Sequence, residues 1–280
     1  MASAILGLDH VMIGVNDLEG ARDDYARLGF TPAPRGDHVG RATSNYCLMF
    51  PDTYLELIGI VRPELDAGGL AESLGVRGEG LQKLALGTPD ADAARAELEA
   101  AGLHPEGPQD LARPLQPSGE MVRFRNLMIP RDDTAGLGLF LCGHKTPELM
   151  RPPELVRHPN GARAFVGITA LVADPAPAAA AMGRLFGRDS VMPTNYGAVV
   201  DTGRGRIHLS TPANFAMLHD GATAPPLPLP SWYALRIAVD SLEATAAYLN
   251  GRGLPCEPIN GGIRIDPEHA RGVLLEFVAA

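Results

Sequence analysis

One pattern of strand, helix and further strands occurs four times along the chain, and this repeat limits the fold more than any other feature. The first copy is the clearest. Residues 6–15 combine β-branched and aliphatic side chains, after which Asn16 and Asp17 interrupt the strand and can cap a helix. Apolar residues then recur at intervals of three and four before the terminating Gly29: Leu18, Ala21, Tyr25 and Leu28. The copy therefore begins with a strand and an amphipathic helix of about three turns.

Three short strands complete the first copy. An irregular strand over residues 30–40 and two further strands over 45–50 and 54–61 are separated by turns, which predicts an antiparallel meander. In the last strand, the side chains of Tyr54 and Glu56 share one face. Because this strand is otherwise apolar, the carboxylate of Glu56 must reach water or find a partner.

The later copies begin near residues 81, 164 and 232. The stretch Val239-Asp-Ser-Leu-Glu243 is similar to Val15-Asn-Asp-Leu-Glu19, which fixes the alignment. The positions of His10 and Glu56 are then taken by Lys83 and Phe140 in the second copy, by Gly167 and His208 in the third, and by Ala234 and Glu276 in the fourth. Glu276 is four residues from the end of the sequence, so we expect it to be exposed.

The repeat has a period of about 70 residues, which indicates duplication. We predict an α+β fold in which four βαβββ units pair into two open barrel-like domains. Pro-rich and aperiodic sequence between the second and third copies predicts a linker. The predicted divisions are an N-terminal domain over residues 1–146, a linker over 147–160 and a C-terminal domain over 161–280.

Composition narrows the class of partner. The 280 residues carry a formal charge of −9 with no basic block, so we expect a small-molecule ligand and no nucleic acid. Cys47, Cys142 and Cys256 are widely spaced and form no Cys-x-x-Cys pair, which argues against a disulfide framework. The sequence shows no signal peptide and no apolar run of about 20 residues, so we expect a cytoplasmic protein that does not bind a membrane.

Five stretches carry a resemblance to a known family: Gly29-Phe-Thr-Pro-Ala-Pro-Arg-Gly-Asp-His38, Ala42-Thr-Ser-Asn45, Tyr54-Leu-Glu-Leu57, His144-Lys-Thr-Pro-Glu148 and His158-Pro-Asn-Gly161. With the βαβββ pattern, they make the chain resemble the vicinal oxygen chelate superfamily, which contains glyoxalase I, the extradiol dioxygenases and bleomycin-resistance proteins. Within it, the chain is similar to glyoxalase-like proteins of bacteria. The resemblance implies that each barrel holds one divalent metal, with ligands from the first and last strands of its two units.

The resemblance makes His10 and Glu56 the candidate metal ligands of the N-terminal pair, where Lys83 and Phe140 take the other two positions. One interpretation is that His10 and Glu56 bind Fe, Mn, Zn or Ni, with a third ligand from His38, Tyr46 or His144. A second interpretation needs no metal. Lys83 pairs with Glu56 or orients an anionic substrate, and His10 acts as acid or base on a carbonyl compound. A third is that His10 and Glu56 are structural.

Four further residues are candidates for substrate binding. His38 and Asn45 stand on neighbouring segments that could form the rim of the N-terminal barrel. Arg35 could bind a carboxylate through two parallel hydrogen bonds, and Tyr46 could line an apolar pocket.

We therefore expect a glyoxalase- or dioxygenase-like enzyme, a lyase or isomerase or else a dioxygenase, with catalytic residues His10, Glu56 and Lys83. Its substrate would be a small oxygenated metabolite held in the N-terminal barrel, with or without a divalent metal. The alternative is a binding protein of the bleomycin-resistance type that sequesters a ligand. A homodimer is compatible with the resemblance, although four units in one chain make pairing between chains unnecessary. Hydrolase and kinase motifs are not found in the sequence.

Overall fold

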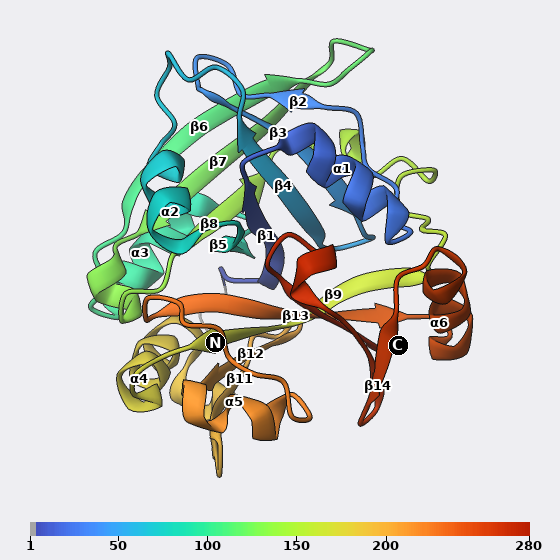
Figure 1. The fold of residues 1–280 in the computed structure, drawn as a ribbon. Helices are drawn as coiled ribbons and strands as arrows, with labels where there is room; N and C mark the ends of the chain where they lie inside the picture. The colour runs from blue at the N-terminus through green and yellow to red at the C-terminus, as the bar shows by residue number, and fades with distance from the viewer. Residues whose placement is uncertain (1–3) are drawn as a thin grey trace.

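Residues 4–280 are described by a computed structural model, in which two eight-stranded sheets pack against each other (Figure 1). The first sheet contains β1 (Gly7–Val15), β2 (Gly36–Asp37), β3 (Thr43–Met49), β4 (Tyr54–Ile60), β5 (Gly80–Gly87), β6 (Glu106–Pro114), β7 (Met121–Ile129) and β8 (Leu139–His144). The second contains β9 (Ala162–Leu171), β10 (Val191–Thr194), β11 (Gly197–Asp201), β12 (Arg206–Ser210), β13 (Ser231–Val239), β14 (Cys256–Ile259), β15 (Gly262–Ile265) and β16 (Leu274–Ala279).

Both sheets have the same topology. The strand order is β2-β3-β4-β1-β5-β8-β7-β6 in the first sheet and β10-β11-β12-β9-β13-β16-β15-β14 in the second. In each unit the first strand lies parallel to the last, as β1 does to β4, and the first strands of two units lie side by side and antiparallel, as β1 and β5 do. The predicted α+β fold of four paired βαβββ units is therefore confirmed.

The helix that follows each first strand begins at the residue type that the sequence predicts. These helices are α1 (Leu18–Arg27), α3 (Ala91–Ala100), α4 (Pro175–Phe186) and α6 (Leu242–Gly251). Their N-cap side chains each accept a backbone N–H, and they come from Asp17, Asp90, Asp174 and Ser241. Each such cap stabilises a helix by about 1 kcal/mol. Gly29 has φ +88°, the left-handed conformation that ends α1 with little strain.

Three elements are not in the predicted pattern. Helices α2 (Leu70–Arg77) and α5 (Pro212–Leu218) follow the last strand of the first and third units, and β10 precedes the two predicted strands of the third. Both helices are short, and the N-cap residue of α2 is Gly69, which has no side chain to accept a backbone N–H. The predicted strand over residues 30–40 is mostly irregular, and it pairs with β3 through Gly36–Asp37 and through an isolated bridge between Pro32 and Leu48.

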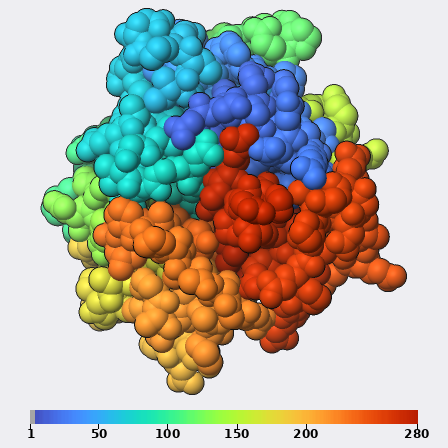
Figure 2. Space-filling model, viewed as in Figure 1, coloured from blue at the N-terminus to red at the C-terminus, as the bar shows by residue number. Residues whose placement is uncertain are grey.

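The two sheets share one apolar core, to which β1, β5, β9 and β13 all contribute. In Figure 2 the blue to teal residues of the first sheet occupy the upper half, and the red C-terminal segment lies against blue residues. The Tyr25 hydroxyl donates to the Ala270 carbonyl at 3.1 Å, and the indole N–H of Trp232 donates to the Gly138 carbonyl at 3.1 Å. The apolar core includes residues from both sides of the predicted linker. The division into residues 1–146, 147–160 and 161–280 therefore stays a prediction.

The end of the predicted linker is fixed to the first sheet by two side chains. Nδ1 of His158 accepts the backbone N–H of Thr31 at 3.0 Å, and Nε2 donates to the Met49 carbonyl at 2.9 Å. The amide of Asn160 donates to the Leu28 carbonyl at 3.0 Å. The motif 158–161 therefore has a structural role: its side chains hydrogen-bond the backbone of the first unit. No helix within residues 4–280 is both long and apolar enough to span a membrane.

Two buried histidines predict how stability depends on pH. Burial lowers the pKa of His158, and likewise that of His208, from 6.5 to about 4. As pH falls below 6.5 the unfolded chain binds protons that the folded chain binds only near pH 4. We therefore expect the unfolding free energy to fall over this window, by up to about 1.4 kcal/mol per pH unit for each histidine. Urea denaturation at several pH values measures the unfolding free energy.

The His158→Gln variant isolates one of these contributions, because glutamine can accept and donate in the same place but does not titrate. Its unfolding free energy should fall less steeply between pH 6.5 and 4 than that of the wild type. Superimposable slopes for the two proteins would show that His158 binds its proton equally well in the folded state.

Candidate functional site

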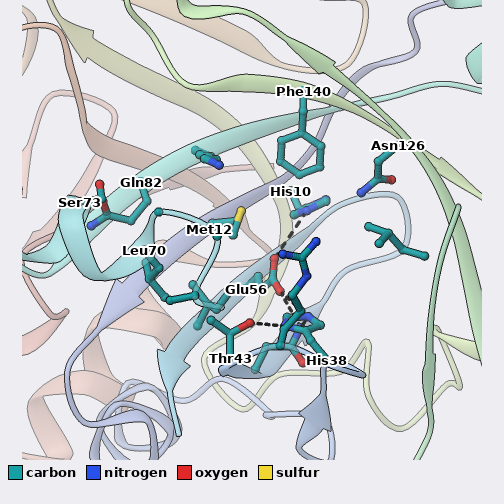
Figure 3. Close-up of a pocket in the computed structure, with 18 of the residues that line it drawn as sticks. His10, Met12, His38, Thr43, Glu56, Leu70, Ser73, Gln82, Asn126 and Phe140 are labelled. Atoms are coloured by element: carbon teal, nitrogen blue, oxygen red, sulfur yellow. Dashed lines mark hydrogen bonds and ion pairs between the residues drawn. The ribbon is translucent and has the colours of Figure 1, made fainter. Parts of the chain in front are cut away.

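A cavity of about 730 Å³ opens on the concave face of the first sheet (Figure 3). Seven of its strands, all except β2, contribute side chains to the wall, and α2 covers one side. His10 and Glu56, on the adjacent strands β1 and β4, project into the same part of this cavity. The size suits a small organic ligand.

His10 is held in one orientation by its neighbours. Its ring stacks on Tyr54, with centroids 4.2 Å apart and planes 14° apart, and contacts Phe140 edge-on at 5.4 Å. Nδ1 lies 2.7 Å from Oδ1 of Asp9. The pairing of β1 with β5 shifts register between Leu8 and His10, a β-bulge that lets the consecutive residues Asp9 and His10 meet. Nε2 of His10 is left facing the cavity.

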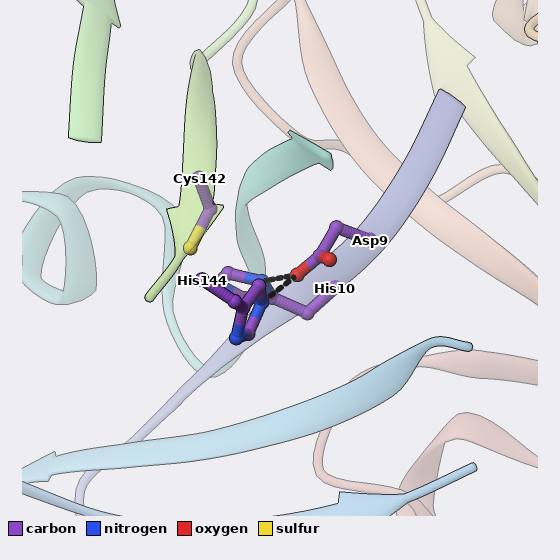
Figure 4. A group of neighbouring side chains, drawn as sticks. All are labelled: Asp9, His10, Cys142 and His144. Carbon is purple, nitrogen blue, oxygen red and sulfur yellow. Dashed lines mark hydrogen bonds and ion pairs between the residues drawn. The ribbon is translucent and has the colours of Figure 1, made fainter. Parts of the chain in front are cut away.

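Asp9 is a buried carboxylate between two imidazoles, His10 and His144 (Figure 4). Its Oδ1 lies 3.0 Å from Nε2 of His144 as well as 2.7 Å from Nδ1 of His10. Burial acts to raise the pKa of Asp9, but the hydrogen bonds from the two histidines outweigh it and hold that pKa well below its usual value. A carboxylate can only accept, so His10 Nδ1 and His144 Nε2 carry the protons. A neutral His10 therefore presents an unprotonated Nε2 to the cavity.

Glu56 receives three polar neighbours. The Asn45 amide donates to Oε1 at 2.5 Å, His38 Nε2 lies 3.8 Å from Oε1, and His10 Nε2 lies 3.7 Å from Oε2. The two imidazole separations from Glu56 are too long for hydrogen bonds. His10 Nε2 can therefore still exchange a proton with a bound molecule, whereas His38 Nε2 lies 3.3 Å from the amide nitrogen of Asn45. Nδ1 of His38 lies 2.8 Å from the Thr43 hydroxyl, and burial lowers the pKa of His38, which keeps this ring neutral near pH 7.

The structure brings five of the predicted site residues together and leaves two outside. The cavity lining includes His10, Glu56, Lys83, His38 and Asn45. Tyr46 and Arg35 are not part of it. Tyr46 follows Asn45 on β3, so its side chain points to the opposite face, where its hydroxyl donates to Glu19 at 2.8 Å. Arg35 pairs with Glu19 at 3.4 Å and with Asp37 at 3.3 Å on the surface.

The proposed pairing of Lys83 with Glu56 is not formed: within residues 4–280, no ion pair joins them. On β5, Lys83 lies opposite Met12, and Ala85 lies opposite His10, so the ammonium is further along the cavity than the alignment of the repeats suggests. Burial, with a smaller contribution from Arg131, lowers the pKa of Lys83.

Three further residues near the cavity, Asp9, Asn126 and Arg113, carry no functional signal in the sequence. Asp9 precedes His10 on a strand, and strict alternation would place it on the far face; no sequence signal marks the bulge. Asn126 on β7 and Arg113 on β6 line the cavity from strands whose residues carried no pattern of their own. Oδ1 of Asn126 is buried with no hydrogen-bond partner among the described residues.

The centre of the corresponding face of the second sheet is filled by side chains. Glu276 is 0% exposed, so the prediction that it is exposed was wrong. Its carboxylate lies 2.8 Å from Nδ1 of His219 and 2.8 Å from Nε of Arg236. His219 directly follows α5, stacks on Phe215 at 4.3 Å, and also lies 3.0 Å from the Thr169 hydroxyl. Helix α5 thus covers the face where the first sheet has its cavity.

The aligned positions do not supply a full set of metal ligands. His10 and Glu56 are the two ligand-type residues, whereas Phe140 is apolar and Lys83 is a cation unless it loses its proton. A different group, Asp9, His10, Cys142 and His144, offers ligand atoms within 4.8 Å of one another and could hold a metal ion. Its shortest contacts are hydrogen bonds, and burial raises the pKa of the Cys142 thiol well above its ordinary value. A metal there would have to displace those protons.

A sequence model of the family described as glyoxalase-like domain matches residues 8–186. The chain belongs to this glyoxalase-like family. None of the curated proteins matches the chain. The fold is that of the vicinal oxygen chelate superfamily, as the sequence predicted, and the family match covers the first two units and the first strand and helix of the third, β9 and α4.

Two solved structures share this fold over nearly the whole chain. A hypothetical protein from Staphylococcus aureus is 13% identical, with a TM-score of 0.68 over 98% of this chain and 99% of that chain. A xylose isomerase-like TIM barrel/4-hydroxyphenylpyruvate dioxygenase fusion protein is 16% identical, with a TM-score of 0.62 over 99% of this chain and 49% of its own. Methylmalonyl-CoA epimerase from Mycobacterium tuberculosis is 25% identical, with a TM-score of 0.43 over 54% of this chain and 96% of its own.

Proposed function

We propose that the glyoxalase-like chain is an enzyme that transfers a proton on a small carbonyl compound bound in the cavity of the first sheet. One observation carries the proposal: Nδ1 of His10 is tied to the buried carboxylate of Asp9, which leaves Nε2 free and directed into the cavity. A histidine oriented by a carboxylate in this way is an effective general base, because one tautomer is selected and the resulting imidazolium is stabilised.

The proposed step is removal of the proton on the carbon next to the carbonyl group. Nε2 of His10 takes the proton, and the electron pair of the C–H bond moves toward the carbonyl oxygen to give an enolate. Glu56, whose Oε2 lies 3.7 Å from His10 Nε2, faces the same region and is the second group that can take or return a proton. Two such groups around one carbon suit an isomerase or lyase, and the step uses no metal.

Deuterium exchange tests this function. The protein, treated with a chelator, is incubated in D₂O with hemithioacetals and hydroxy ketones, and the carbon next to the carbonyl is followed by NMR. We expect deuterium to enter at that carbon, and we expect Glu56→Gln to slow the exchange by about tenfold to a hundredfold. Glu72→Gln is the matched control, because Glu72 lines the cavity from α2 and is exposed.

Three outcomes would contradict the proposal. Binding of the panel without exchange would favour a sequestering protein. Consumption of O₂ with ring cleavage of catechols included in the panel would favour a dioxygenase. Loss of exchange on chelator treatment, with recovery on adding back a divalent ion, would show that a metal takes part in the step.

A further inference from the structure

The cavity contains a buried arginine that has no carboxylate partner. Arg113 on β6 is 6% exposed and lines the cavity wall. Within residues 4–280 no ion pair includes it, and the one hydrogen bond found for its guanidinium runs from Nη2 to Cys47 Sγ at 3.9 Å. Arginine is almost never buried this fully without a partner, because removing its charge from water is costly.

The lining around Arg113 is cationic, although the protein as a whole has a net charge of −9. Five basic side chains line the cavity, Arg41, Arg77, Lys83, Arg113 and Arg131, against the two acidic side chains Glu56 and Glu72. Lys83 and Arg131 have no carboxylate within ion-pair distance among the described residues. The positive field of this cavity therefore favours an anionic ligand.

The backbone beside Arg113 is shaped to admit the guanidinium. A Cβ added to Gly36 on β2 would lie 2.6 Å from Nη1 of Arg113 and 2.5 Å from Oδ1 of Asn45. Any larger residue at this position would displace both side chains. Arg113 also lies near the proton-transfer groups, since it hydrogen-bonds Cys47, which pairs with Glu56 across β3 and β4.

From these observations we propose that Arg113 binds a carboxylate group of the substrate, so that the substrate is a small oxo or hydroxy acid. The identity of the reacting carbon rests on the proposed function, whereas the binding of the carboxylate does not. The planar guanidinium matches a carboxylate through two parallel hydrogen bonds. A substrate carboxylate bound inside the cavity would be the partner that Arg113 lacks.

Benzoate and its neutral analogue benzamide are the probes for this site, with binding measured by ligand-observed NMR. We expect the wild-type protein to bind benzoate about tenfold to a hundredfold more tightly than benzamide. Arg113→Gln should abolish this preference, and Arg113→Lys should retain part of it, because lysine keeps the charge but not the planar fork. Arg163→Gln is the control, since Arg163 forms an exposed pair with Asp240 and should leave the preference unchanged.

Gly36→Ala gives a second test that does not depend on how Arg113→Gln folds. The added methyl group would push aside the guanidinium of Arg113 and the amide of Asn45 while keeping the positive charge. Benzoate binding should therefore weaken, and benzamide binding should change little. Equal affinity of the wild type for the two probes would overturn the proposal, as would unchanged benzoate binding by both variants. Displacement of benzoate by inorganic phosphate at lower concentration than by acetate would overturn the choice of a carboxylate.

The same probes separate this proposal from the proposed function. His10→Gln should bind benzoate in preference to benzamide as the wild type does, even where it fails to exchange deuterium. A wild-type protein that exchanges no substrate but retains the preference would contradict the proton-transfer function and support the carboxylate site.

Discussion

Replacement of His10 by Gln is expected to lower kcat/KM for proton abstraction by about 10²- to 10⁴-fold, the range typical of a positioned general base. Glutamine can still accept or donate a hydrogen bond but cannot take up a proton near pH 7. The stacking on Tyr54 and the edge contact with Phe140 would be partly kept, so the fold should persist. Initial rates of deuterium exchange at several substrate concentrations measure the effect.

Asp9→Asn distinguishes the role of the carboxylate from that of the imidazole. Asparagine can still accept one hydrogen bond, but its amide group would donate toward a histidine and favour the other tautomer of His10. We therefore expect a smaller loss than for His10→Gln, seen mainly in kcat, together with a change in the pH profile of exchange. A purely structural role for Asp9 would lower stability and leave the pH profile unmoved.

The control for both variants is His104→Gln. His104 also lies near a carboxylate, with Nδ1 3.3 Å from Asp133, but its side chain is 83% exposed and it does not line the cavity. The deuterium exchange rate of the His104→Gln variant should equal that of the wild type. If His10→Gln retains more than about a tenth of the wild-type rate, His10 is not the general base.

The fold could be predicted from the sequence because its signals are local and repeated. Asp17 caps α1 and Gly29 ends it, as the sequence indicates, and the same arrangement recurs in each unit. The alignment of the repeats also placed His10 and Glu56 in one cavity, since both stand on the strands β1 and β4 that pair side by side.

What the sequence did not reveal depends on irregular backbone and on contacts between distant segments. Asp9 reaches His10 through a bulge, and a pattern with a period of two residues cannot show where a bulge occurs. Arg113 comes from a strand whose residues look solvated in sequence, and its burial follows from the curvature of the first sheet. Glu276 seemed exposed because it is near the chain end, yet β16 lies inside the second sheet.

The two sheets use their aligned carboxylates differently. Glu56 lines a cavity and contacts imidazoles at distances beyond hydrogen bonding, whereas Glu276 is bonded directly to its partners. The difference comes from α5, which brings His219 over the second sheet. The corresponding segment of the first unit leads into α2, which lines one side of the cavity and leaves it accessible. At this aligned position the duplicated sheets therefore differ: the first has a cavity, and the second has a buried polar network.

Glu276→Ala should therefore destabilise the protein by about 3 kcal/mol or more, since it leaves the buried His219 and the guanidinium of Arg236 without their carboxylate. Burial acts to raise the pKa of Glu276, yet the bond to His219 and the charge of Arg236 hold that pKa below its usual value, so the charged carboxylate is the stable form. The unfolding free energy from urea denaturation at pH 7 measures the loss.

Glu99→Ala provides the comparison, because Glu99 also pairs with an arginine, Arg95, but the two side chains are 50% and 46% exposed. Exposed pairs contribute about 0–1 kcal/mol, so this variant should differ little from the wild type. Deuterium exchange by folded Glu276→Ala should be unaffected, since Glu276 does not line the cavity of the first sheet. Equal stability of the Glu276→Ala and Glu99→Ala variants would show that the buried network is replaced by water or by rearrangement of α5, and that the pairing of Glu276 with His219 and Arg236 does not stabilise the fold.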